Sequence, residues 1–100
     1  YPPFSALANV LLRSQKQEEA MRMSNEIAYR LTPPPENIKV LGPAEAPVAR
    51  LKNEYRYQLL IKAADRRTLN ETLHDLRRFA NESKWSPVSI VIDVDPLTLL

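Results

Sequence analysis

The chain has 100 residues, a formal net charge of +2 at pH 7 and no cysteine. This length fits one domain with a single core, and 44% hydrophobic and 26% charged residues predict a soluble globular fold and exclude a disordered tail. The composition also excludes disulfides and thiolate chemistry, while nine prolines against one glycine exclude a glycine-rich phosphate loop.

The first third of the chain predicts a strand followed by a helix. Apolar residues alternate from Phe4 to Arg13, which is typical of a strand with one fully apolar face. Ser14 and Gln17 fit a capping box, and four apolar residues then recur at helical spacing: Ala20, Met23, Ile27 and Leu31. We therefore expect a helix from about Gln15 to Leu31, ended by three consecutive prolines.

The middle of the chain predicts two strands of unequal length. Residues 38–41 form a short extended run before Gly42-Pro43, and residues 44–54 contain Pro47 and predict a long loop. Residues 55–62 alternate so regularly that Tyr55, Tyr57, Leu59 and Ile61 are expected to share the core face.

The last third predicts a helix and a final strand. Asp65 is a suitable cap for a helix ending near Ser83, whose apolar stripe consists of Leu69, Leu73, Leu76, Phe79 and Ala80. Pro87 is expected to start the last strand, in which Val88, Ile90, Ile92 and Val94 share one face.

This order of elements predicts an α+β ferredoxin-like βαββαβ fold, with two helices on one face of a four-stranded antiparallel sheet. The other face of the sheet is expected to carry several apolar residues, namely Leu7, Leu11, Leu41, Leu60 and Val91. Such a face is better explained by docking of a partner than by exposure to solvent alone.

No motif for phosphate, dinucleotide, zinc or acyl-transfer chemistry occurs in the sequence. His74 has no second histidine or cysteine to complete a metal site. Asp93 and Asp95 invite comparison with catalytic carboxylate pairs, but capping or pairing with a basic residue is the favoured role. Trp85 is expected to cover the core, and the predicted inward direction of the two strand tyrosines disfavours base stacking.

Basic residues are the remaining candidates for function. Those predicted to bind DNA or a protein partner are Arg50, Lys52, Arg56, Lys62, Arg66 and Arg67. Two of them open the second helix, where a positive charge opposes the helix dipole and a functional reason is therefore favoured. Arg77 and Arg78 are interpreted as ordinary solvated residues.

Several motifs resemble one family. The run from Leu41 to Arg50 (LGPAEAPVAR), followed by YRYQLLIK at residues 55–62, resembles the GPxxAPxxR…YRxQLLxK stretch of the C-terminal domain of PriA helicases, also called primosomal protein N′. YPPF at the start and DVDP at residues 93–96 are similar to the segments that open and close that domain. The resemblance covers the whole chain.

The resemblance implies that residues 1–100 are the C-terminal domain of a larger ATP-dependent 3′ to 5′ DNA helicase of replication restart, with residues 1–4 leading in from the helicase core. It implies no catalysis in this domain, with ATP, Mg²⁺ and Zn²⁺ bound only by upstream parts. It implies branched or forked DNA, the helicase lobes, other primosome proteins and the tail of single-stranded DNA-binding protein as partners, in the bacterial cytoplasm at the nucleoid. Arg66 is the candidate for the acidic tail, because an arginine fork suits a carboxylate.

A free-standing ferredoxin-like module, either regulatory or RNA-binding, is the alternative interpretation. Regulatory, metal-carrying and acylphosphatase-like members of this fold place a glycine-rich or CxxC element after the first strand, where this chain has Arg13-Ser14-Gln15. An RNA-binding module would need Tyr55 and Tyr57 on the open face of the sheet.

Overall fold

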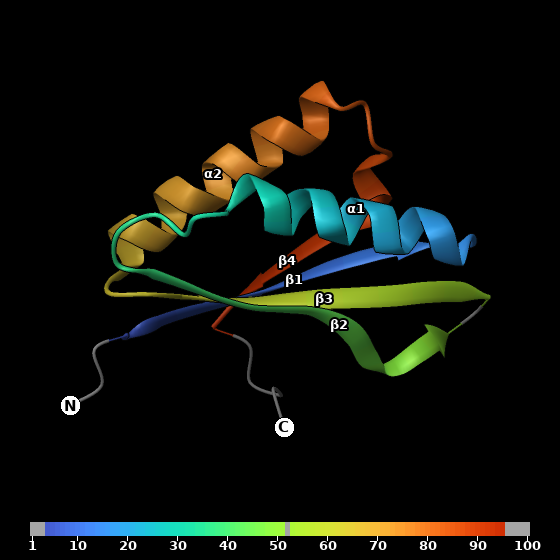
Figure 1. The fold of residues 1–100 in the computed structure, drawn as a ribbon, viewed down its shortest axis with the longest axis horizontal. Helices are drawn as coiled ribbons and strands as arrows, with labels where there is room; N and C mark the ends of the chain where they lie inside the picture. Colours follow the sequence, from blue (N-terminus) through green and yellow to red (C-terminus); the bar gives the residue numbers. More distant parts are fainter. Residues whose placement is uncertain (1–3, 52, 96–100) are drawn as a thin grey trace.

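The computed structural model describes residues 4–51 and 53–95, although the side chains of residues 47–51 are outside the description. The elements are, in chain order, β1 (Ala6–Ser14), α1 (Gln17–Arg30), β2 (Ile38–Leu51), β3 (Glu54–Ala63), α2 (Arg66–Glu82), a 3₁₀ turn η1 (Pro87–Ser89) and β4 (Ile90–Val94). The strands form one antiparallel sheet in the order β2-β3-β1-β4. Both helices lie on the same side of this sheet (Figure 1), which confirms the ferredoxin-like prediction.

The core lies between the sheet and the helices. Residues at alternating positions of the strands point into it, and Val10, Leu12, Leu59 and Ile61 have no exposed surface. The apolar stripe of α2 packs on them, with Leu69, Leu73 and Leu76 almost fully buried. The residues that alternate in the strands and those that recur at helical spacing are therefore buried in the same layer, as expected when the local sequence pattern is consistent with the fold.

Strand β2 differs from the expectation, because it runs from Ile38 to Leu51 where a short strand and a long loop were predicted. Its register against β3 shifts twice, between Leu41 and Ala44 and again between Glu45 and Arg50. Pro43 and Pro47 lie within these two irregular stretches. A proline lacks the N–H that a regular ladder needs but is tolerated at a bulge, so the prediction of a loop was wrong.

The start of α1 also differs from the predicted capping box. The helix begins at Gln17 after Lys16, which makes no side-chain cap. The Ser14 hydroxyl instead accepts a hydrogen bond from the Lys16 N–H at 3.1 Å and donates one to Glu19 Oε1 at 2.6 Å. Ser14 therefore organises the turn before the helix, and the N-cap position belongs to Lys16.

The other two boundaries are close to their predictions. Asp65 caps α2 by accepting a hydrogen bond from the Thr68 N–H at 2.8 Å, which confirms its predicted role and lowers the pKa of its carboxyl group. Strand β4 begins at Ile90, since Pro87 starts a 3₁₀ turn and does not start the strand. The fixed φ of proline suits the first position of a helical turn, which explains this error. No helix in the described part of the chain is long and apolar enough to span a membrane.

Candidate functional site

The candidate site is the face of the sheet that the helices leave uncovered, and we call it the open face. Because strand residues alternate between the two sides of a sheet, the neighbours of the core residues lie here. The open face comprises Leu7, Asn9, Leu11 and Arg13 of β1, Lys39 and Leu41 of β2, Arg56, Gln58, Leu60 and Lys62 of β3, and Val91 and Asp93 of β4.

The apolar residues of the open face are neighbours across the strands. Leu41 lies directly opposite Leu60, and Leu11 lies directly opposite Val91. Leu41 is 41% exposed and Val91 is 39% exposed, whereas Leu11 is nearly buried between its neighbours. All the apolar residues predicted for this face therefore lie on one surface: Leu7, Leu11, Leu41, Leu60 and Val91. Cross-strand neighbours on such a surface are close enough for their side chains to touch.

Two pairs of like charges lie on this face. In the antiparallel register Lys39 is directly opposite Lys62, and Arg13 is directly opposite Arg56. Like charges in directly opposed positions of a sheet destabilise it, so each pair carries an electrostatic cost. An anion bound beside each pair, one at either end of the open face, would offset this electrostatic cost.

The two pairs differ in their surroundings. The Arg13 Nε–H donates to the Val88 carbonyl at 2.6 Å, and its guanidinium lies 3.8 Å from a Glu54 carboxylate oxygen. Of the ion pairs among the described residues, none includes Lys39 or Lys62. The lysine pair is therefore the less compensated of the two and the better candidate for an anionic ligand.

The basic residues predicted from the sequence do not form one cluster. Arg56 and Lys62 lie on the open face, while Arg66 and Arg67 begin α2. Arg56 lies seven residues before the end of β3, a distance of roughly 23 Å along the strand. Lys52 lies outside the described residues, as does the side chain of Arg50, whose backbone pairs with Tyr55 in β3.

At the start of α2 the two arginines already have acidic partners. Arg66 forms an ion pair with Asp95, and Arg67 lies 3.7 Å from Glu71. The Asp95 backbone N–H also donates to the Leu7 carbonyl at 2.8 Å, which fixes this aspartate beside the end of β1. Asp95 thus pairs with a basic residue, as predicted.

The other candidates from the sequence have structural roles. The Tyr57 hydroxyl accepts a hydrogen bond from Gln17 of α1 at 3.1 Å, so this ring faces the helices and offers no stacking platform. The Trp85 ring packs edge-on against Phe79 with 5.6 Å between centroids, as expected for a cover on the core. The described residues contain no group of acidic residues or histidine that could hold a metal ion.

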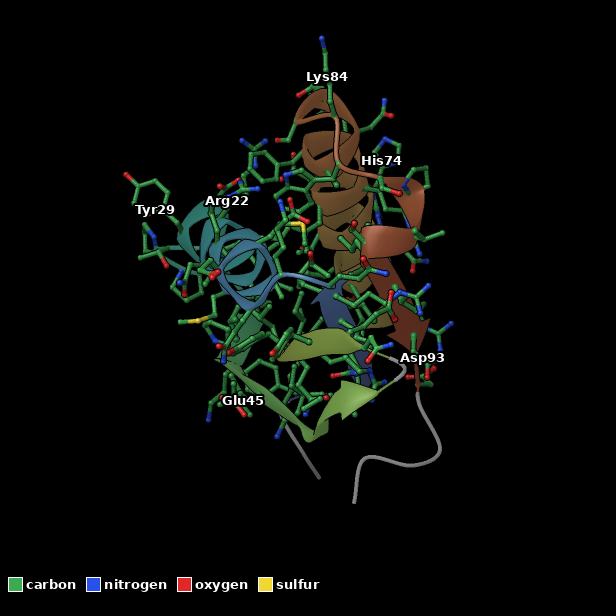
Figure 2. All side chains as sticks on the ribbon, turned by 90° about the vertical axis from the view of Figure 1, so that its right-hand side faces the viewer. Arg22, Tyr29, Glu45, His74, Lys84 and Asp93 are labelled. Carbon is green, nitrogen blue, oxygen red and sulfur yellow. The ribbon has the colours of Figure 1, made fainter. Side chains whose placement is uncertain are left out.

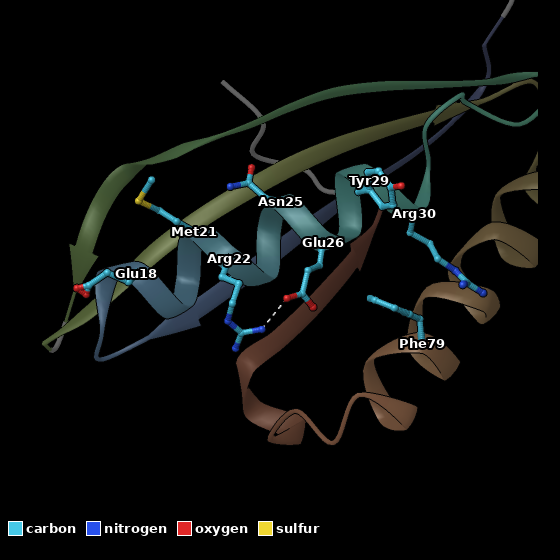
Figure 3. A pocket seen from close by; sticks show the side chains of 8 residues that line it. All are labelled: Glu18, Met21, Arg22, Asn25, Glu26, Tyr29, Arg30 and Phe79. Carbon is cyan, nitrogen blue, oxygen red and sulfur yellow. Dashed lines mark hydrogen bonds and ion pairs between the residues drawn. The ribbon is translucent and has the colours of Figure 1, made fainter.

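A depression of about 930 Å³ lies on the outer side of α1 and reaches Phe79 of α2 (Figure 3). Met21 and Tyr29 are its exposed apolar residues. Two of its charged residues, Arg22 and Glu26, pair with each other at 2.6 Å, and Arg30 pairs with Asp75 of α2 at 2.9 Å.

Sequence reasoning missed Lys39 and Arg13 as members of the site. Both positions have the parity of the outward-facing residues of their strands, a signal that was available in the sequence. Their pairing with Lys62 and Arg56 depends on the register between strands distant in the chain, which local pattern does not contain.

The fold defines a class, the ferredoxin-like α+β domains. A de novo designed protein, Foldit4, has a similar structure with a TM-score of 0.62 over 95% of this chain and 98% of its own, at 14% sequence identity. The family is given by the sequence. Residues 1–97 match the model of the primosomal protein N C-terminal domain, and the chain belongs to that family.

Curated relatives agree with this family. The chain is 32% identical to the replication restart protein PriA of Bacillus subtilis over 100% of its own length, and 30% identical to that of Haemophilus influenzae over 98%. The PriA protein of Rickettsia prowazekii is also 30% identical, over 97% of the chain. The chain spans only 13–14% of the length of these relatives.

Proposed function

We propose that this domain binds branched DNA and docks protein partners through the open face of its sheet, as the C-terminal part of a replication restart helicase. The observation that carries the proposal is the pair of opposed lysines, Lys39 and Lys62, on a face that also holds exposed apolar residues. Lysine and arginine contacts to phosphates supply most of the affinity of proteins for DNA irrespective of sequence.

The mixed character of the face supports two kinds of contact. Phosphates bind the basic ends, while the apolar strip around Leu41 and Leu60 packs against the helicase lobes or another primosome protein. ATP, Mg²⁺ and Zn²⁺ belong to other parts of the helicase in this proposal, and the protein acts at the bacterial nucleoid.

Charge reversal at Lys39 and Lys62 tests the proposal. In the full-length protein, the variant with Lys39→Glu and Lys62→Glu is expected to bind forked DNA at least 10-fold more weakly, because two phosphate contacts are replaced by repulsion. Fluorescence anisotropy of a labelled fork measures this. The matched control reverses Arg22 and Arg78, which lie on the helices and already have acidic partners. Equal affinity of the wild type and the Lys39/Lys62 variant would contradict the proposal.

Arg66 is the proposed site for the acidic tail of single-stranded DNA-binding protein. The supporting observation is that Arg66, which is 56% exposed, already holds the Asp95 carboxylate as a ligand carboxylate would be held. Arg66→Ala is expected to weaken binding of a peptide with that tail sequence at least 5-fold, whereas Asp95→Asn frees the guanidinium and is expected to tighten it. Calorimetric titration checks both, and a peptide affinity that neither change alters would rule out this site.

A further inference from the structure

The side of α2 that faces away from α1 carries a continuous row of exposed polar residues. We call it the α2 flank, and it consists of Arg67, Asn70, His74, Arg77 and Asn81, extended beyond the helix by Lys84. Spacings of three and four residues put these positions on one side of a helix. Figure 2 shows His74 on this side, with α1 on the opposite side of α2, and Lys84 at the far end.

The α2 flank contains no acidic residue. The acids of α2 are Glu71, Asp75 and Glu82, and at 100° per residue all three point at least roughly 120° away from Arg77. Asp75 is also held by two arginines, at 2.9 Å from Arg30 and 3.1 Å from Arg78. Glu71 lies about 40° from Arg67, with which it pairs at 3.7 Å, whereas Asp75 and Glu82 point away from the flank.

Arg77 and its neighbour Arg78 differ in their ion pairs. Arg78 pairs with Asp75, but no ion pair within the described part of the chain includes Arg77 or Lys84. The pair of Arg67 with Glu71, at 3.7 Å and with side chains 88% and 69% exposed, is weak enough to open. Arg77 thus differs from Arg78, although the sequence predicted that both are ordinary solvated residues.

Complementation of the helix dipole does not account for this arrangement. That effect is confined to the last turn of a helix, and the last turn of α2 contains no basic residue. The exposed side of α1 provides a comparison within the same chain, because there Glu18, Arg22 and Glu26 alternate in sign. An acid-free row beside such a mixed row indicates an anionic partner for α2.

We propose, building on the proposed DNA binding, that the α2 flank binds the phosphodiester backbone of a second arm of branched DNA, while the open face holds the first arm. The helices cover the opposite side of the sheet from the open face (Figure 1), so a single straight DNA arm cannot contact both surfaces. The row from Arg67 to the end of α2 at Glu82 covers about 22 Å of helix axis, long enough for several phosphates, and Lys84 lies just beyond it. Guanidinium, ammonium and amide groups are the usual donors to phosphate oxygens.

Charge reversal on the flank tests the proposal in the full-length protein. The variant with Arg67→Glu and Arg77→Glu is expected to bind a three-armed DNA fork at least 10-fold more weakly and to change its affinity for linear single-stranded DNA less than 2-fold. The matched control, Arg22→Glu with Arg78→Glu, changes the net charge equally and is expected to alter both affinities less than 3-fold. Equal losses in the two variants, or no loss on the fork, would overturn the proposal.

Crosslinking gives a second, independent readout. A photoreactive phenylalanine analogue replaces Gln58 on the open face in one protein and His74 on the α2 flank in another, and each arm of the fork carries a different label. The two positions are expected to crosslink to different arms. Crosslinks from both positions to the same arm, or none from the flank, would refute the second-arm contact.

The outcomes separate this inference from the function on which it rests. If Lys39→Glu with Lys62→Glu weakens fork binding and Arg67→Glu with Arg77→Glu does not, only the α2 flank is excluded. If the lysine reversal leaves fork binding unchanged, the proposed function of the open face fails.

Discussion

Gly42 occupies a position that no other residue can fill without strain. Its φ is +101°, and a Cβ atom built there would lie 2.9 Å from the Gln58 carbonyl oxygen of the neighbouring strand. This is the only glycine of the chain, and it lies where β2 shifts its register against β3. Gly42 thereby allows the strand that carries Lys39 and Leu41 to continue past Pro43.

Gly42→Ala is expected to lower the free energy of unfolding by about 1–3 kcal/mol, because it combines a forced positive φ with a backbone contact too short for Cβ. Urea unfolding followed by circular dichroism measures the change. Asn37, with φ of 65°, provides the control, since Asn37→Gly introduces a residue suited to its conformation and should cost little. A Gly42→Ala protein as stable as the wild type would show that β2 has another way to make this shift.

The residues of the candidate site were partly predictable. Arg56 and Lys62 follow from the alternation of residues 55–62, since their neighbours Tyr57, Leu59 and Ile61 are so clearly apolar. The partners of these two residues were not predictable, because which residue lies opposite depends on how strands far apart in the chain align. The difference between Arg77 and Arg78 likewise depends on Asp75 and Arg30, which belong to two helices.

At the scale of the elements, the packing of α1 on α2 is fixed by an ion pair as well as by the core. Arg30 of α1 forms two hydrogen bonds with Asp75 of α2, at 2.9 and 3.1 Å, and its guanidinium lies 5.2 Å from the centre of the Phe79 ring. The hydrogen bond from Arg30 is the main cause that lowers the pKa of Asp75, and Arg78 adds to it. The pKa of Arg30 is raised by the same contact.

This pair makes stability depend on acid pH. Because the folded pKa of Asp75 lies below its unfolded value of about 3.9, the stabilisation is complete above that value and is lost as the pH falls through the folded pKa. Asp75→Asn is expected to be less stable than the wild type at pH 7 and to lose less stability between pH 5 and 2. Thermal unfolding across this range measures both, and parallel pH profiles of the two proteins would contradict this role.

Elements with a clear period were predictable, and elements interrupted by proline were not. The alternation of β1 and β3 and the apolar stripe of α2 gave their types and directions correctly, because burial of one face leaves a regular trace in the sequence. Strand β2 contains Pro43 and Pro47, which indicate a loop by local rules but lie in a bulged strand in the structure. Local rules cannot distinguish the two, since the strand exists only through its pairing with β3.

In the whole molecule, the two sides of the sheet differ in what covers them. One side is closed by two helices and forms the core, and the other exposes apolar residues between two pairs of like charges. The helix layer on the other side of the sheet carries a second surface, the α2 flank. We propose that the domain contacts nucleic acid from two directions and contributes binding.

The central claim, that the open face neutralises phosphates, is tested most directly by the salt dependence of DNA binding. In the full-length protein, the affinity for forked DNA is expected to fall linearly with salt concentration on logarithmic axes, and replacing Lys39 and Lys62 by glutamine is expected to make the slope shallower by about 2. An unchanged slope in the Lys39→Gln, Lys62→Gln variant would contradict the account, because it would mean that neither lysine contacts a phosphate.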